Sequence, residues 1–304
     1  MSPYLSVIIP TYNRLEKLKK CLNALNKQTL TEDSFEILVV DDGSEDETLN
    51  FLKSLSEQWQ IVRVLHQKNS GQGIARNLAI QEARGQILLF IGDDIYCAPD
   101  FLKKHTDFHQ ENPGTNFACL GLTVWDPAQP ISPFMDWLTS GGPQFAYHHL
   151  SPQEEASFWY FYTSNLSLKK EFLAKERFDP DFKAYGFEDI ELGYRLFKKG
   201  LKLVYCPEAL ALHDHPMEEG SLKKRMQNIG ASALIFQSKA PEISVVPRGF
   251  KKLLLKLASS FPVLGFFWIA KSLFPALAQR KYWVLLSKKY FLKGLSRRKG
   301  EYLL

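Results

Sequence analysis

The sequence predicts an α/β protein, in which a mostly parallel β-sheet is flanked by helices and followed by a helical, basic and amphipathic extension. Over the first hundred residues, short apolar runs alternate with segments of helical periodicity, and this alternation is typical of a parallel sheet covered on both faces. From Arg248 to the end, 13 Lys and Arg residues stand against one acid, whereas the preceding 247 residues hold 25 bases and 32 acids. The extension therefore differs in character from the body before it.

Four apolar runs are expected to form the parallel strands, at residues 6–10, 35–40, 61–65 and 86–91. They are apolar along their length, as in strands that are buried on both faces. Helices are expected between them. Asn13 and Ser44 have the residue types of N-caps, each with a Glu three residues later, and a third helix is expected from Ser70–Gly71 to about Ala83.

The regular alternation fades after about residue 112. Residues 126–157 are rich in Pro, Gly, His and aromatic side chains, and they predict a long, partly irregular segment. Further elements are expected as a strand within 158–168, a helix over 188–199 and a strand over 202–206. Pro241 and Pro247 mark a break before the basic extension.

The composition excludes several classes of protein. Of the 304 residues, 45% are hydrophobic and 23% are charged, which suits a globular core and excludes a disordered or fibrous chain. The four cysteines lie far apart without a CxxC pair, which argues against a zinc knuckle or a disulfide framework and favours a reducing compartment. No GxGxxG motif follows the first strand, which excludes a nicotinamide-binding domain.

Two acidic pairs, Asp41-Asp42 and Asp93-Asp94, follow two of the expected strands. Ligands of open parallel sheets bind beyond the carboxyl ends of the strands, so both pairs are expected to face one crevice. Adjacent carboxylates repel each other, and a hard divalent cation that bridges to a diphosphate would relieve this repulsion. The alternative is that these aspartates only make turns or cap helices.

Two later segments also carry chemistry. Glu188-Asp189 opens an expected helix, whose dipole stabilises an ionised carboxylate and so suits a general base; ordinary N-capping is the alternative. The motif His213-Asp214-His215 follows an apolar run, and one imidazole could complete a metal site. Two histidines in a surface loop are the alternative.

Together these motifs resemble family 2 glycosyltransferases, which share the GT-A fold and use nucleotide sugars. The resemblance spans about residues 4–215 and rests on motifs in a fixed order: Ser6-Val-Ile-Ile-Pro-Thr-Tyr-Asn13, Val39-Val-Asp-Asp-Gly-Ser44, Asn69-x-Gly71 with Ala75-Arg76-Asn77, Asp93-Asp94, Thr163-Ser-Asn165, Glu188-Asp189 and the His213 loop. It implies one Rossmann-like GT-A domain with a nucleotide-sugar-binding half at 1–110 and an acceptor-binding and catalytic half at 111–220. The third part of the chain, at 221–304, is expected from its own composition to be a helical, membrane-associating extension.

The resemblance also implies roles for individual residues. Tyr12 would stack on the base, Asp42 would read the base edge and Asp93 would bind the ribose. The full set of nucleotide-sugar-binding residues that it implies is Thr11, Tyr12, Asn13, Arg14, Asp42, Asn69, Gly71, Arg76, Asp93 and Asn165; for Asn165 a structural role is the alternative. Trp125, Trp159 and Tyr160 are further candidates for stacking on a sugar, with core packing as the alternative.

For the reacting centre, the resemblance implies Asp189 as the catalytic base, with Glu188 contacting the acceptor or orienting the site. Asp94 and His213 would hold Mg²⁺ or Mn²⁺, with His215 as a weaker substitute for His213. The sequence departs from the fuller family pattern because Gly92 stands where an Asp is common.

The function implied is inverting transfer of a sugar from a UDP- or dTDP-sugar to an acceptor hydroxyl, in the biosynthesis of a surface glycan or polysaccharide. Two rivals remain: a nucleotidyltransferase and a non-catalytic nucleotide-sugar binder. The first is expected to carry a Gly-rich, basic loop after the first strand, where this chain has Thr11 to Arg14. The second is expected to lack an acid at 94 or 189, and both acids are present.

The basic extension predicts contact with an anionic membrane. Leu257 to Ala270 is a 14-residue run without a charge, too short to span a core of ~30 Å, and further on aromatic pairs such as Tyr282-Trp283 alternate with bases, as in headgroup-layer segments. The expected location is cytoplasmic, peripheral on the inner face of the cell membrane, with a glycan or lipid-linked acceptor and no nucleic acid. Packing onto the domain and a homo-oligomer interface are the alternatives.

Overall fold

The computed structural model describes residues 3–183 and 185–296. The chain divides into two compact units. The first unit comprises Met1–Ile131, Phe145–Pro180 and Asp189–Pro216, and the second comprises Ser132–Gln144, Asp181–Glu188 and Met217–Leu304. Two short pieces from within the expected 111–220 part thus belong to the same unit as the C-terminal extension.

The first unit is built on one mixed sheet. Four parallel strands lie in the order β3 (Val62–His66), β2 (Phe35–Asp41), β1 (Leu5–Thr11) and β4 (Ile87–Ile91). The sheet continues through β8 (Asn165–Lys169), β6 (Phe117–Trp125), β9 (Lys202–His213) and β5 (Ile95–Cys97), and β7 (Glu155–Ala156) pairs with β9. Most paired residues lie in the parallel ladders β1–β2, β1–β4, β2–β3 and β6–β9, which confirms the predicted mostly parallel sheet.

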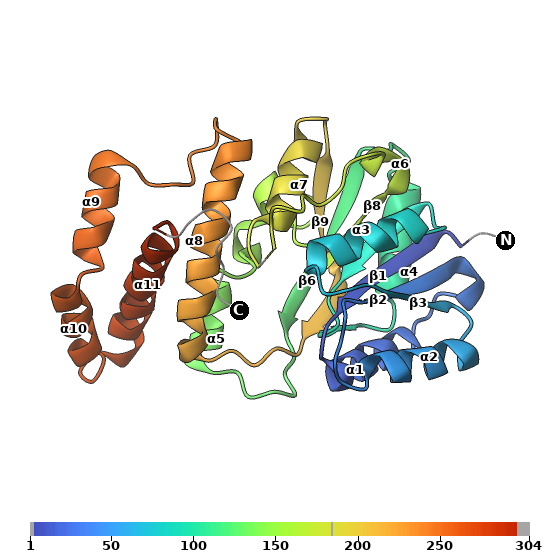
Figure 1. The fold of residues 1–304 in the computed structure, drawn as a ribbon, viewed down its shortest axis with the longest axis horizontal. Helices are drawn as coiled ribbons and strands as arrows, with labels where there is room; N and C mark the ends of the chain where they lie inside the picture. Colours follow the sequence, from blue (N-terminus) through green and yellow to red (C-terminus); the bar gives the residue numbers. More distant parts are fainter. Residues whose placement is uncertain (1–2, 184, 297–304) are drawn as a thin grey trace. The chain divides into compact units, whose positions relative to one another are not determined.

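Helices cover both faces of this sheet, and the strands supply apolar residues to each (Figure 1). In β1, Val7 and Ile9 join the core on one face while Ile8 joins the core on the other, as the two-residue period of a strand requires. The first face is covered by α1 (Leu15–Leu25), α2 (Thr48–Gln58) and α4 (Phe101–Glu111), and the second by α3 (Gln72–Glu82) and α7 (Glu188–Phe197). A short α6 (Lys170–Leu173) follows β8, and 3₁₀ turns lie at Glu32–Ser34, Tyr147–His149, Phe158–Tyr160 and Glu219–Ser221.

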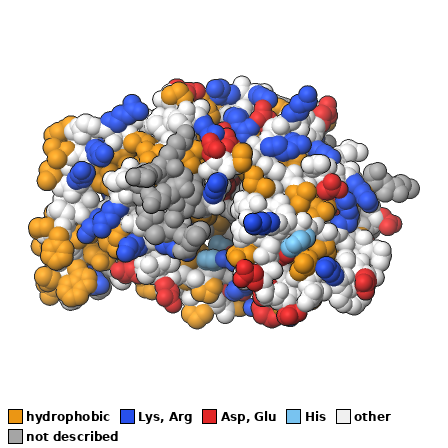
Figure 2. All heavy atoms as spheres, viewed as in Figure 1, with side chains coloured by type: hydrophobic (Ala, Val, Ile, Leu, Met, Phe, Trp, Pro, Cys, Tyr) orange, Lys and Arg blue, Asp and Glu red, His pale blue; other side chains and the backbone are white. Residues whose placement is uncertain are grey.

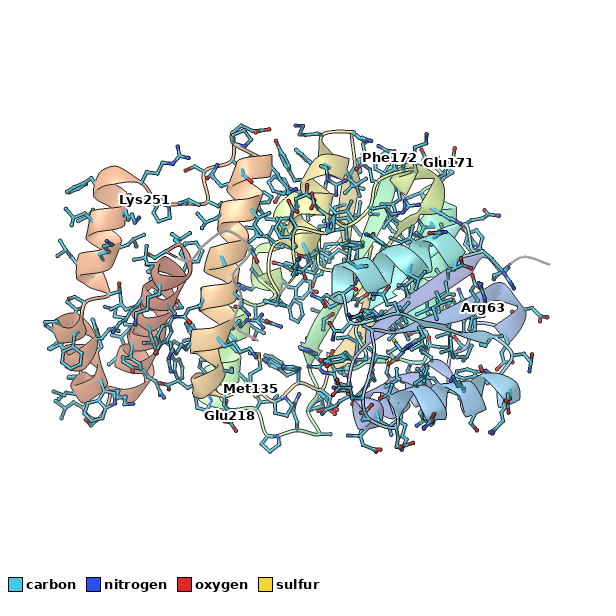
Figure 3. The ribbon with its side chains drawn as sticks, viewed as in Figure 1. Arg63, Met135, Glu171, Phe172, Glu218 and Lys251 are labelled. Carbon is cyan, nitrogen blue, oxygen red and sulfur yellow. The ribbon has the colours of Figure 1, made fainter. Side chains whose placement is uncertain are left out.

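Arg63 ties the edge strand β3 to the rest of the sheet (Figure 3). Its Nη1 donates to Glu36 Oε2 at 2.8 Å and to the carbonyl of Glu82 at 2.9 Å. Glu36 Oε1 in turn accepts from Ser6 Oγ at 2.7 Å and from the backbone N–H of Arg84 at 2.6 Å. Burial opposes the charge on Glu36, but these donors outweigh it and lower the pKa of its carboxyl.

The predicted N-caps are wrong. Helix α1 begins after Arg14, and α2 begins after Glu47. Asn13 instead adopts a left-handed backbone, with φ of 52°, its Oδ1 accepts from the N–H of Glu45 at 2.7 Å, and its own N–H donates to Ser44 Oγ at 2.9 Å. Asn13 and Ser44 therefore join the loops after β1 and β2, which are neighbours in the sheet.

Two further expectations need correction. The strand expected within 158–168 is only β8, because 158–160 form a 3₁₀ turn. Strand β6 was not predicted at all, although it lies inside the sheet between β8 and β9. Its ladder with β9 shifts register at Gly121/Leu122, and such an irregularity leaves little local signal in the sequence.

The second unit is helical, with α5 (Pro133–Ser140), α8 (Leu222–Lys239), α9 (Gly249–Ala258), α10 (Phe261–Ala270) and α11 (Pro275–Gly294). Glycines let α8 and α11 approach closely: a Cβ on Gly294 would lie 2.2 Å from the carbonyl of Gln227, and one on Gly230 would lie 2.4 Å from the carbonyl of Phe291. Trp283 of α11 is 2% exposed. Its ring contacts two aromatic rings of α5, those of Phe134 and Trp137.

Candidate active site

The candidate active site lies at the carboxyl ends of β1, β4 and β9, where a parallel sheet places its ligands. Thr11 is the last residue of β1, Asp93 and Asp94 follow β4, and His213 ends β9. Thr11 Oγ1 donates to Asp93 Oδ2 at 2.8 Å. Asp93 and Asp94 are 5% and 7% exposed, so the sheet holds two neighbouring carboxylates out of bulk water.

Arg14 supplies the positive charge that this acidic pair needs. Its Nη1 lies 3.0 Å from Asp93 Oδ1 and 2.7 Å from Asp94 Oδ2. Burial and the charge of Asp94 nevertheless raise the pKa of Asp93 to about 6. Burial also opposes the charge on Asp94, but its contacts with His213, His215 and Arg14 hold the pKa of Asp94 well below its usual range. The arrangement thus keeps Asp94 as a carboxylate.

Asp94, His213 and His215 form a group that could hold a metal ion. Asp94 Oδ2 lies 3.5 Å from His213 Nε2 and 3.0 Å from His215 Nδ1, and one ligand atom from each residue lies within 4.8 Å of the others. One carboxylate oxygen and two imidazole nitrogens suit Mn²⁺ well, and Mg²⁺ less well because Mg²⁺ favours oxygen ligands. The structure therefore brings His215 into the group beside the predicted pair, Asp94 and His213.

Aromatic rings fix the orientation of His213. The ring of Trp125 stacks on the imidazole with centroids 5.1 Å apart and an interplanar angle of 11°, and Phe145 meets it edge-on at 5.7 Å. Trp125 and His213 are also register partners across β6 and β9. Trp125 is buried against the histidine, which favours the alternative of core packing over its candidate role in stacking on a sugar. Trp159 is 38% exposed and remains a candidate for that role.

Asp214, for which no role was predicted, anchors the histidine loop. Its carboxylate accepts from Tyr96 Oη at 2.7 Å and pairs with Lys17 Nζ at 2.6 Å and Lys20 Nζ at 3.3 Å. Burial would raise the pKa of Asp214, but these partners lower it to about 2. Its backbone N–H donates to the carbonyl of Asp94 at 2.9 Å. Asp214 thus connects α1 and β5 to the loop that carries both histidines.

The position of the Asp94 side chain leaves little room for an acid at position 92, where the family pattern often has an Asp. A Cβ built on Gly92 would lie 2.8 Å from Asp94 Oδ1, closer than real Cβ contacts allow. An aspartate at position 92 would therefore displace the Asp94 carboxylate from its present position.

A second group of residues surrounds Asp42, which follows β2, the neighbour of β1 in the sheet. Gly71 of this group was predicted. Asp42 Oδ1 accepts from Gln67 Nε2 at 2.7 Å and from the N–H of Ser70 at 2.9 Å, and Oδ2 accepts from the N–H of Gly71 at 2.8 Å. Gly71 has φ of 92°, a left-handed conformation that favours glycine, and α3 begins directly after it. Asp42 therefore holds the loop that opens α3, and its reading of a base edge stays a prediction.

The carboxylate of Asp41, the first residue of the pair Asp41-Asp42, is surrounded by protein partners. Asp41 is fully buried, its Oδ2 lies 2.8 Å from His66 Nδ1, and its carboxylate accepts from the N–H of Ser44 at 3.3 Å. For Asp41, these contacts favour the alternative interpretation as a turn residue.

The remaining nucleotide-site residues differ in exposure. The ring of Tyr12 is 41% exposed and accessible for stacking, and Asn69 is exposed in the loop before α3. Arg76 is 4% exposed, with its guanidinium 5.5 Å from the ring of Phe178 and its Nη2 3.3 Å from Gln72 Oε1. Its predicted contact with the nucleotide stays a prediction.

Asn165 is a core residue, which favours the structural alternative over its predicted place beside the donor. It is fully buried, its Nδ2 donates to the carbonyls of Leu122 at 3.1 Å and Ala209 at 2.9 Å, and its Oδ1 lies 2.9 Å from His105 Nε2. A Cβ on Gly121 would lie 2.4 Å from the Asn165 amide. The side chain thus fills the irregular register between β6 and β9.

We expect Asn165→Ala to lower the free energy of unfolding by about 2–4 kcal/mol, because buried carbonyls and an imidazole would lose their partner. Denaturant unfolding followed by circular dichroism measures the change, and the exposed Asn50→Ala is the matched control. A loss no larger than that of the control would contradict the assigned role.

Two buried histidines beside Asn165 predict a pH dependence of stability. Ser167 Oγ lies 2.9 Å from His105 Nδ1 and 2.8 Å from His109 Nε2. Burial lowers the pKa of His105 to about 4 and that of His109 to about 3. In the unfolded chain both regain a pKa near 6.5, so unfolding takes up protons and stability falls as the pH drops below about 6.5.

The test is His109→Gln, which removes one of these groups. Between pH 6.5 and pH 4.5 we expect wild type to lose about 2 kcal/mol more unfolding free energy than this variant. Over part of this window Asp93 acts in the opposite direction, because its pKa is raised, so the difference between the two proteins is the quantity to measure. Parallel pH profiles would contradict the prediction.

Asp189 lies in the first turn of α7, half-buried, and its Oδ1 accepts from the N–H of Ile190 at 2.8 Å. The backbone before it is unusual, with φ of 120° at Gly186 and 68° at Phe187. Glu188 is 4% exposed, and its Oε2 accepts from the N–H of Gly186 at 2.8 Å. Of the two roles predicted for Glu188, these contacts favour orienting the loop, and the helix start favours an ionised Asp189.

Comparison with known proteins finds similarity to glycosyltransferases. Residues 6–128 match the model of Glycosyl transferase family 2. The uncharacterized glycosyltransferase YfnE of Bacillus subtilis is 29% identical over 271 residues, covering 74% of this chain and 68% of that protein. The validoxylamine A glucosyltransferase of Streptomyces hygroscopicus subsp. jinggangensis is 29% identical over 277 residues, and the chain spans 65% of its length.

Solved structures share the fold. The mannosyltransferase PcManGT from Pyrobaculum calidifontis, in complex with GDP-Man and Mn²⁺, has a TM-score of 0.66 at 19% identity, over 97% of this chain and 86% of that one. Residues 1–349 of Staphylococcus aureus TarS, in complex with UDP, give 0.53 at 17% identity, over 96% and 88% of the two chains. At these identities the likeness establishes the fold alone.

Proposed function

We propose that the chain, whose residues 6–128 match the model of Glycosyl transferase family 2 and whose fold is of the GT-A type, transfers a sugar from a UDP- or dTDP-sugar to an acceptor hydroxyl with inversion. The observation that carries the proposal is the group of Asp94, His213 and His215 at the carboxyl ends of β4 and β9. A carboxylate and two imidazoles converge there next to the residues implied for nucleotide binding.

Each residue of the candidate site has a defined task in the proposed reaction. Thr11 and Arg14 hold the Asp93 carboxylate, which binds the ribose hydroxyls. Tyr12 offers an exposed ring to the base. Asp94, His213 and His215 would hold Mn²⁺ or Mg²⁺, which when bound neutralises the charge of the leaving diphosphate.

Asp189 acts as the general base. Its carboxylate accepts the proton of the acceptor hydroxyl while that oxygen attacks the anomeric carbon, and the bond from that carbon to the diphosphate breaks. The start of α7 stabilises the ionised form that this role requires. Glu188 holds the backbone of Gly186, two residues earlier, and so positions the loop that leads to Asp189.

We place this activity in the biosynthesis of a surface glycan. Among the relatives are poly(ribitol-phosphate) glycosyltransferases of Bacillus spizizenii and Staphylococcus aureus, which are 34% and 36% identical over about a third of this chain. They support a polymeric or lipid-linked acceptor, and the choice of sugar is left to experiment.

A screen of nucleotides with and without Mn²⁺ tests the proposal. UDP-, dTDP- and GDP-sugars and nucleoside triphosphates are assayed for thermal stabilisation of the protein and for hydrolysis. We expect Mn²⁺-dependent stabilisation and slow hydrolysis with UDP- or dTDP-sugars. Turnover of a nucleoside triphosphate with a sugar phosphate would instead identify a nucleotidyltransferase, and binding without any hydrolysis would identify a non-catalytic binder.

A further inference from the structure

Helices α9 and α10 expose an apolar surface that the proposed function does not use. We call Gly249–Ala270 the apolar segment. Figure 2 shows hydrophobic side chains gathered over α10. The large side chains that are at least about half exposed are Phe250, Leu253, Leu254 and Leu257 on α9, and Phe261, Phe266, Trp268 and Ile269 on α10. In a monomeric soluble protein, an apolar patch of this extent marks a binding surface.

The sequence of α9 makes this exposure systematic. Its four exposed apolar residues are spaced i, i+3, i+4 and i+7 from Phe250, so they form one stripe along the helix. Lys251, labelled in Figure 3, Lys252 and Lys256 lie outside this stripe. In a water-soluble domain such a stripe normally packs onto the core, whereas here it is exposed. The stripe therefore has no apolar surface packed against it among the described residues.

Helix α10 is apolar on all sides. The run between Lys256 and Lys271 contains no charged residue, and Leu264 is the one buried residue of α10. Phe261 at its first position is 82% exposed. A helix that is hydrophobic all round belongs in an apolar medium.

Each of the two helices is long enough to reach about halfway through a bilayer. Among the described residues, no single helix is long and apolar enough to cross a membrane, and only α9 and α10 taken together meet that test, with a bend of 43° between them. Each has ten residues and so is about 15 Å long, half the thickness of the ~30 Å hydrocarbon core.

Cations border the apolar surface. Lys271 Nζ lies 5.5 Å from the ring of Trp268 and 5.4 Å from that of Tyr282, and Lys281 Nζ lies 6.0 Å from the ring of Phe267. Aromatic rings with lysines at the edge of an apolar patch match the headgroup layer of a bilayer. From Arg248 to the end of the described residues the chain holds ten bases and no acid. Arg280 pairs with Asp136 of α5, and the excess of the other bases makes an anionic surface the complementary one.

Helix α11 holds the apolar segment through its buried side, although Leu277 in its first turn is exposed. It is packed against α8 at Gly230 and Gly294, and its Trp283 Nε1 donates to Glu219 Oε2 at 2.8 Å. The expectation that Tyr282-Trp283 contacts lipid headgroups is thus wrong for Trp283, which is buried among aromatic rings. The basic cluster at 297–299 lies outside the described residues.

We propose that the apolar segment inserts into one leaflet of an anionic lipid bilayer, with α11 fixing it to α5 and α8. A second copy of the chain fits this surface less well. In a two-fold symmetric dimer each patch would face its own copy, so the bordering lysines would face like charges.

Flotation with liposomes tests the proposal on the full chain. Wild type is compared with the double variant Leu257→Glu/Phe261→Glu and with Ile131→Glu, a control at a 48%-exposed position of the first unit. With vesicles of phosphatidylcholine and phosphatidylglycerol, we expect wild type and the control to float and the double variant to bind at least about tenfold more weakly. Binding of wild type should fall with phosphatidylcholine alone and at high salt.

A fluorescent label provides a second readout that does not depend on the charged variants. The four native cysteines are buried, so a polarity-sensitive dye can be attached selectively to Ile269→Cys or, as the control, to Ile131→Cys. We expect vesicles to shift the emission to the blue only at position 269. Equal flotation of wild type and the double variant, or no shift at 269, would overturn the proposal. So would a concentration-dependent dimer without vesicle binding, measured by sedimentation. None of these measurements requires sugar transfer.

Discussion

Replacing Asp189 with asparagine is expected to reduce sugar transfer by at least about 100-fold, while donor affinity stays within a few-fold of wild type. The variant keeps the size of the side chain and can still accept from the N–H of Ile190, but it cannot take the proton of the acceptor hydroxyl. A positioned general base typically contributes ~10²–10⁴-fold to the rate. The measurement is the initial rate of transfer, with donor affinity determined separately by calorimetry.

Asp107→Asn is the matched control, because Asp107 is an aspartate of α4 whose described contact is an ion pair with Lys103. It should transfer at the wild-type rate. If Asp189→Asn also retains near wild-type transfer, the base lies elsewhere, and Glu188→Gln is the next variant to measure.

Asp94→Ala is expected to weaken metal-dependent donor binding by at least about 100-fold. Loss of an outer-shell partner of a metal ligand typically costs 10–100-fold, and removal of a ligand should cost at least as much. The change also removes one of the two ion pairs of Arg14 and leaves the one with Asp93. Calorimetric titration with UDP, with and without Mn²⁺, measures the effect.

Asp214→Asn gives a graded comparison for the same titration. It keeps the metal ligands but weakens the anchor formed by Lys17 and Lys20, so its affinity should lie between those of wild type and Asp94→Ala. Unchanged UDP–Mn²⁺ affinity in Asp94→Ala would show that the cation is held by other residues.

The parallel half of the sheet could be predicted because its strands carry their own signal. β1, β2 and β4 are buried along their whole length, so their sequences are largely apolar runs. β6 could not be predicted in this way. It pairs in parallel with β9 and antiparallel with β8, with a register shift at Gly121/Leu122, and its place depends on residues far away in the chain.

The candidate site shows the same division. The resemblance singled out Asp94 and His213, and the structure places them 3.5 Å apart between ligand atoms. It gave no indication that Arg14 would bridge Asp93 and Asp94, or that Arg14 Nη2 would lie 3.2 Å from His215 Nδ1, 201 positions later. Asn165 matched a motif, yet both atoms of its side-chain amide are hydrogen-bonded to residues around the register shift and to His105. Local motifs report residue types, whereas long-range packing decides their partners.

The extension illustrates a further limit of sequence patterns. Aromatic residues and bases alternate in both α9–α10 and α11, and one prediction covered both. The structure separates them: the stripe of α9 is exposed, while Trp283 of α11 is 2% exposed. A helical stripe shows that an apolar partner is needed, but it does not distinguish a lipid from a neighbouring helix.

The stereochemistry of donor hydrolysis tests the central claim most directly. In the absence of an acceptor, water can take its place, and proton NMR can follow the anomeric proton of the released sugar before mutarotation. With an α-linked UDP- or dTDP-sugar and Mn²⁺, the account predicts the β-anomer as the first product, formed by wild type and lost in Asp189→Asn. Initial release of the α-anomer, or donors of the whole panel left intact with Mn²⁺ present, would contradict it.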